Sequence, residues 1–69
     1  MENKMNQDTV SIRNKISVRE DEAAVLLSVS SKTLSRWRAD GQGPPCFQRG
    51  KLWFYPVKTI EVWAESQAV

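Results

Sequence analysis

The sequence predicts a small, mainly α-helical domain with one β-hairpin, in the order helix, turn, helix, hairpin, helix. Two short amphipathic segments are separated by three residues, an aromatic strand–turn–strand pattern follows a Gly/Pro-rich loop, and a proline opens the last periodic segment. The chain has 69 residues, which is enough for one domain at most. We expect that domain to span residues 15–66, between a mobile tail at 1–14 and a frayed end at 67–69.

The first helix is predicted to follow a short extended segment at residues 16–18. Acidic residues at 20–22 suit its first turn, because the positive end of the helix dipole favours negative charge. Two N-caps remain open: Ser17, which has capping-box spacing to Glu20, and Arg19, which is a poor capping residue. The apolar arc of this helix consists of Ala23, Ala24, Leu26 and Leu27. Its alanines allow a second helix to approach closely.

The second helix is predicted over Ser31–Asp40, with Ser30 as its N-cap and Gly41 as its stop. Val29, in the turn between the helices, is expected to point inward. The apolar arc consists of Thr33, Leu34 and Trp37. The opposite arc is small, polar and basic, and consists of Ser31, Lys32, Ser35, Arg36 and Ala39. Two short helices joined by such a turn form a helix-turn-helix.

A β-hairpin is predicted after a loop at residues 41–45, with strands at 47–49 and 52–55 around a tight turn at Gly50–Lys51. Side chains alternate along a strand. The two faces of the second strand are therefore Trp53 with Tyr55, and Leu52 with Phe54.

Pro56 is placed to begin a third helix, since its missing N–H costs nothing there. That helix is expected to run from Val57 to Ser66, with Ile60 and Ala64 on its inner side. The predicted core aromatics are Trp37, Trp53 and Trp63. Together, the elements have the order of a winged helix-turn-helix domain.

The composition argues against catalysis and metal binding. The chain has no histidine and a single cysteine, Cys46, so it lacks the commonest general base, an internal disulfide and a zinc site. Its longest apolar run, Ala23–Leu27, is far shorter than the ~18 residues that span a membrane, and the first residues lack the apolar stretch of a secretory signal. We expect a cytoplasmic protein that is not an enzyme, with no cofactor, metal or small-molecule substrate.

Positive charge is concentrated in the middle of the chain. The net charge is only +2, but residues 28–55 carry five basic side chains against one acidic side chain, a balance of +4. A solvated surface is one interpretation, and double-stranded DNA in contact with the second helix and the hairpin tip is the other. The predicted DNA-binding residues are Ser31, Lys32, Ser35, Arg36, Arg38, Arg49 and Lys51. For Arg38, the alternative is that its stem covers the core.

Several segments also resemble one known family. They are residues 22–30 and 33–37, Gly43–Pro45, Gly50–Tyr55, and Ile60 with Trp63. In this order they resemble MerR-like excisionase-family domains, a family that includes AlpA-type prophage regulators. The resemblance covers Val18–Ala64, and it implies a winged helix-turn-helix that contacts DNA through its second helix and its wing.

Three residues depart from the family pattern. Ser28 stands where Gly is common, Arg19 where a Ser or Thr cap is usual, and Phe54 where a polar residue is frequent. The departure at Phe54 predicts an exposed apolar patch that suits a protein partner.

Three functions remain open at this stage. The resemblance favours an excisionase of a phage or other mobile element, which binds and bends attachment-site DNA and works with an integrase or with further copies of itself. A transcription regulator that binds a promoter is the alternative on the same domain. From another class, a protein-interaction module would use Phe54 or Leu52 as its contact.

Overall fold

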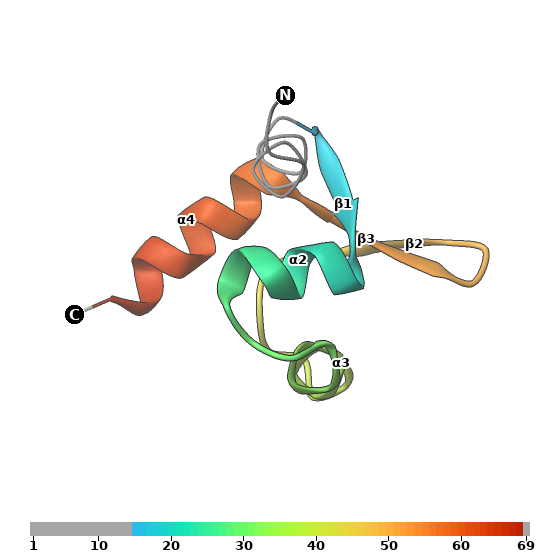
Figure 1. Cartoon of the computed structure of the whole chain (residues 1–69), viewed down its shortest axis with the longest axis horizontal. Coiled ribbons are helices and arrows are strands. Elements are labelled where there is room, and N and C mark those ends of the chain that lie inside the picture. Colours follow the sequence, from blue (N-terminus) through green and yellow to red (C-terminus); the bar gives the residue numbers. More distant parts are fainter. Residues whose placement is uncertain (1–14, 69) are drawn as a thin grey trace, which may run out of the picture.

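The computed structural model describes residues 15–68, which form three helices and a three-stranded antiparallel sheet (Figure 1). The elements are β1 (Ser17–Arg19), α2 (Glu20–Leu27), α3 (Ser31–Ala39), β2 (Phe47–Arg49), β3 (Leu52–Pro56) and α4 (Val57–Gln67). This is a small winged helix-turn-helix fold, as predicted. The tail predicted at residues 1–14 lies outside the described residues, and α4 continues to Gln67, one residue beyond its predicted end.

The sheet has one strand more than the predicted hairpin. The short extended segment before α2 becomes β1, which pairs with β3, so that β3 lies in the centre of the order β1-β3-β2. Val18 is opposite Tyr55, and both are 1% exposed on the face turned toward the helices. Phe54 is opposite Arg19 on one side and Phe47 on the other, on the outer face. The predicted division of β3 into two faces is therefore confirmed.

Helix α2 begins after Arg19, which is the second of the two predicted N-caps. The Arg19 side chain makes no capping hydrogen bond, but its backbone N–H donates to the Glu22 carboxylate over 3.0 Å. Ser17, the other candidate, belongs to β1. Ala23 and Ala24 are 0% and 2% exposed, which confirms their place between α2 and the elements packed against it.

The turn after α2 places Ser28 in a backbone conformation that glycine adopts most easily. Ser28 has φ 61° and ψ 37°, in the left-handed region that costs a non-glycine residue about 1 kcal/mol. Backbone hydrogen bonds from Ser28 to Val25 (3.1 Å) and from Val29 to Ala24 (3.0 Å) close the helix end. Val29 is half-buried against the core, as predicted.

Helix α3 is held at both ends by the predicted residues. The Ser30 hydroxyl oxygen accepts a hydrogen bond from the Thr33 N–H over 3.0 Å, and Gly41 has a positive φ of 74° just past the end. Leu34 in the middle of the helix is fully buried. The helix is one residue shorter than predicted, with Asp40 as its C-cap.

The central aromatic residue of the core is Tyr55, and none of the three tryptophans is fully buried. Trp37 and Trp53 are partly buried and pack against the buried cluster, whereas Trp63 packs on Trp37 with ring centroids 5.8 Å apart. The buried cluster consists of Val18, Ala23, Ala24, Leu34, Tyr55, Val57 and Ile60. The prediction of core tryptophans is therefore confirmed in part, since Trp37 and Trp53 pack at the rim of the cluster.

Replacing Ser28 with glycine is expected to stabilise the fold by about 0.5–1 kcal/mol, because it removes the left-handed strain at a modest entropy cost in the unfolded chain. Urea unfolding of the two proteins measures this difference. Ser28→Ala is the matched control, since it keeps the Cβ and should give no gain. A Ser28→Gly protein that unfolds at lower urea than the wild type would contradict the explanation.

Candidate nucleic-acid interface

The exposed face of α3 carries the basic side chains that the sequence placed there. Ser31, Lys32 and Arg36 are exposed, and Ser35 is half-buried. No residue of α3 is acidic. Figure 1 shows α3 end-on below α2, at the edge of the molecule. This helix face is open to a partner along its length.

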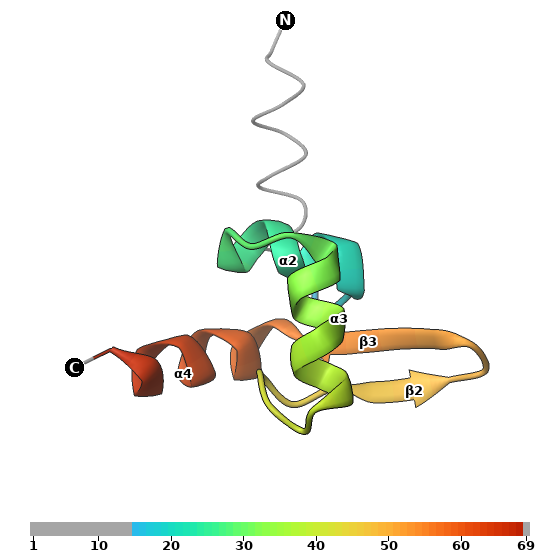
Figure 2. The ribbon, with the colours of Figure 1, turned by 90° about the horizontal axis from the view of Figure 1, so that it is seen from below.

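The β2–β3 hairpin, which we call the wing, projects from the side of the molecule opposite α4 (Figure 2). Gly50, with φ 61°, forms its tight turn and leaves Lys51 exposed at the tip. Arg49 is also exposed, but its guanidinium lies 5.3 Å from the centre of the Phe47 ring and donates to the Gln48 carbonyl over 3.2 Å. Arg49 is therefore drawn toward the outer face of the wing, whereas Lys51 stands at the tip.

A groove of ≈ 290 Å³ lies between the first residue of α3 and the tip of the wing, alongside the start of α2. It is lined by Arg19, Glu20, Asp21, Ser31, Lys51, Leu52 and Trp53. Two of the predicted contacts, Ser31 and Lys51, thus line the same groove. A phosphodiester strand that contacts both would cross this groove.

Arg38 has partners inside the protein. Its Nε donates to Glu20 Oε2 over 2.6 Å and its Nη2 donates to Glu20 Oε1 over 3.2 Å, which is a bidentate ion pair. The guanidinium also lies 4.3 Å from the centre of the Trp53 ring and donates to Ser35 Oγ over 3.2 Å. The side chain is only 22% exposed. This geometry agrees with the alternative raised by the sequence, in which the Arg38 side chain covers the core. We therefore assign Arg38 a structural role, in which it holds α3 in place, and not a DNA contact.

Glu20 connects Arg38 to the sheet. The Tyr55 hydroxyl donates to Glu20 Oε2 over 2.6 Å, so one carboxylate links α2, α3 and β3. The hydrogen bond from Arg38 holds the pKa of the Glu20 carboxyl below its usual value of 4.5, and the bond to Glu20 raises the pKa of Arg38 in turn. Burial raises the pKa of Tyr55, and its bond to Glu20 adds to that effect. At neutral pH the cluster therefore holds one anion, one cation and a neutral phenol.

Sequence reasoning missed Glu20 and Tyr55 as supporting residues, because they are 35 residues apart and each had a simpler local explanation. One signal was present. Glu20 stands at the i position of an i, i+3, i+4, i+7 arc whose other members are Ala23, Ala24 and Leu27. A carboxylate at such a position turns toward the core and needs a buried partner.

One comparison with known proteins identifies the fold family. The profile of a family described as a helix-turn-helix domain matches residues 19–68, from the N-cap of α2 to the C-cap of α4. The chain belongs to this helix-turn-helix family. No curated protein matches the sequence.

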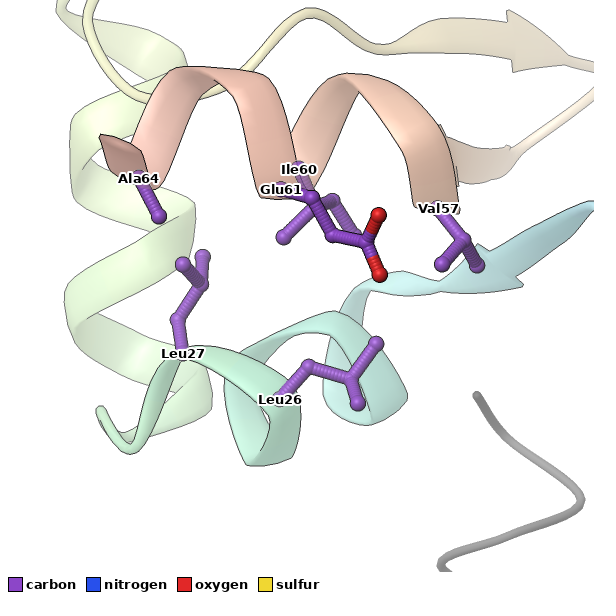
Figure 3. Close-up of a pocket in the computed structure, with 6 residues that line it drawn as sticks. All are labelled: Leu26, Leu27, Val57, Ile60, Glu61 and Ala64. Atoms are coloured by element: carbon purple, nitrogen blue, oxygen red, sulfur yellow. The ribbon is translucent and has the colours of Figure 1, made fainter. Parts of the chain in front are cut away.

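The helix-turn-helix protein has a second hollow, between α2 and α4 (Figure 3). It is lined by Leu26, Leu27, Val57, Ile60, Glu61 and Ala64. Its volume of ≈ 140 Å³ is below the roughly 300–1,000 Å³ of small-molecule pockets. Ala64, which was predicted to face inward, lines this hollow and is exposed, so that prediction was wrong.

Metal binding, membrane insertion and thiol chemistry find no support in residues 15–68. No group of three or more Cys, Asp or Glu side chains in this part of the chain is arranged to hold a metal ion. No helix among these residues is long and apolar enough to cross a membrane. Cys46 is half-buried, and burial raises its thiol pKa, which opposes formation of a nucleophilic thiolate.

The Glu20 cluster is expected to make stability depend on pH. Because the Glu20 pKa is lower in the folded state, its contribution is complete above its usual value of 4.5 and is lost as pH falls through the folded value. Glu20→Gln should cost about 1–2 kcal/mol at pH 7, and its difference from the wild type should shrink in acid. Urea unfolding at pH 7, 5, 4 and 3 measures both effects.

The control for this experiment is Glu65→Gln, which removes the same charge from an exposed position on α4. Glu22 also has a lowered pKa, chiefly through the Arg19 N–H, but it is present in all three proteins and cancels in the differences. A constant gap between the wild type and Glu20→Gln at every pH would contradict the assigned role.

Proposed function

We propose that this helix-turn-helix protein binds double-stranded DNA in a sequence-specific manner and acts by binding, without catalysis. In this proposal α3 lies in the major groove, and the wing tip contacts the adjacent backbone. The observation that carries it is the exposed basic face of α3, together with a groove that is lined by Ser31 at the start of this helix and by Lys51 at the wing tip. A merely solvated surface does not require that arrangement.

The chemistry of each side chain indicates which part of the DNA it would contact. Lys32 and Arg36 are exposed cations that suit phosphates or guanine acceptors, and Ser31 stands beside the groove. Ser35 already accepts a hydrogen bond from Arg38, so its hydroxyl proton is left to donate to a phosphate or to a base acceptor. Lys51 is the wing contact favoured by the geometry, and Arg49 reaches DNA only if its guanidinium leaves Phe47.

The biological role we propose is that of an excisionase of a mobile element, which bends DNA beside an attachment site. This rests on the family resemblance of the helices, the wing and the last helix. A single domain of this size makes a small contact, so binding at repeated sites or together with an integrase would supply the missing affinity. A promoter-binding regulator uses the same surface and is the alternative.

A protein-interaction module is a second candidate because the outer face of the wing is apolar. Phe47 and Phe54 stack there with ring centroids 5.5 Å apart. Phe47 is 37% exposed and Leu52 41%. Phe47 and Phe54 do not line the groove between α3 and the wing, although Leu52 does, so a partner on the two stacked rings would leave Ser31 and Lys51 free.

Selection of genomic fragments tests the proposal. The wild type and the double variant Arg36→Ala/Lys51→Ala are compared at low and moderate salt, and the double variant is expected to lose the selected fragments. Removing two phosphate contacts should also lower the slope of log affinity against log salt by about two. Sites beside an integrase attachment site support an excisionase, and sites at a promoter support a regulator.

Lys58→Ala is the matched control, since it removes an exposed cation from α4. It should leave both the affinity and the salt slope nearly unchanged. Equal binding by the double variant and the wild type would mean that the basic face is only solvated. The apolar outer face of the wing would then become the leading site.

A further inference from the structure

The groove between α3 and the wing contains a carboxylate that the proposed function does not use. Asp21 is exposed and lines this groove together with Ser31 and Lys51. Its Oδ1 accepts a hydrogen bond from the Glu22 N–H over 2.9 Å, and it forms no ion pair within residues 15–68. The other acidic residue of the groove, Glu20, is neutralised by Arg38. Asp21 therefore presents a carboxylate without an ion-pair partner among residues 15–68 to this groove.

A negative charge in this place has a defined effect on DNA binding. A phosphodiester strand that contacts Ser31 and Lys51 would cross the groove and come close to Asp21. Phosphates carry the same charge in every DNA sequence, so the repulsion does not depend on the bases. It weakens as salt screens the two charges.

We propose that Asp21 restrains the affinity of this protein for DNA of any sequence. The inference rests on the proposed function and deepens it. Lys51 and the basic face of α3 attract all DNA alike, and Asp21 offsets part of that attraction. Stable occupancy then requires the base contacts of α3 or neighbouring sites.

The structural explanation of Asp21 is that an acid in the first turn stabilises α2 through the helix dipole. That role predicts that a neutral variant is less stable and binds no better. The restraining role predicts that the same variant binds more tightly. Affinity therefore separates the two, and asparagine keeps the side-chain oxygen that accepts from Glu22.

The experiment measures binding of the full chain to two duplexes, one selected from the genome and one of random sequence. At low salt, Asp21→Asn should bind both duplexes more tightly by the same factor, about three- to tenfold. The gain should shrink as salt rises. Glu65→Gln makes the same change in net charge on α4, away from the wing, and should give a smaller gain.

Each other outcome has a distinct meaning. If the wild type binds and Asp21→Asn gains no more than Glu65→Gln, the inference is wrong while the proposed function stands. A change in affinity confined to the selected duplex would mean that Asp21 acts in base recognition, and it would also overturn the inference. If the wild type binds neither duplex at any salt, the proposed function fails and the inference falls with it. Urea unfolding of Asp21→Asn confirms that the compared proteins are folded.

Discussion

The arrangement of the binding surface depends on one carboxylate. Glu20 accepts two hydrogen bonds from Arg38 and one from Tyr55, so it ties α2, α3 and the central strand together. A hydrogen bond between charged groups is stronger than one between neutral groups. The bonds between Arg38 and Glu20 are also partly shielded from solvent beside Trp53. Because Arg38 belongs to α3 and Tyr55 to β3, this link joins the helix with the basic face to the strand that continues into the wing.

The Glu20 link also adds to the stability of a fold that has only a small apolar core. The fully buried side chains are few, and most are aliphatic or alanine. Tyr55 extends through this core and ends on Glu20, which gives its hydroxyl a partner and keeps the burial of the phenol favourable. The large rings of Trp37 and Trp53 then form an outer layer instead of a centre. Tyr55 therefore belongs both to the apolar core and to the hydrogen-bonded cluster of Glu20.

The charges near the groove act in opposite directions. Lys51 and the basic side chains of α3 attract a polyanion, whereas Asp21 repels it. The charge of Glu20 is offset by its ion pair with Arg38. Charges of the same sign in the sequence therefore have different roles according to their neighbours. The outer face of the wing, with Phe47 and Phe54 in contact, is separate from this balance.

The sequence alone determined the elements, because their signals are local: Ser30 as a cap, Gly41 as a stop and Pro56 at the start of α4 each act within a few residues. It also placed the exposed basic face of α3. Only the tertiary structure decided that a third strand joins the sheet, and that Arg38 turns inward to Glu20. Both depend on contacts between residues distant in the chain, for which a single sequence carries no spacing rule.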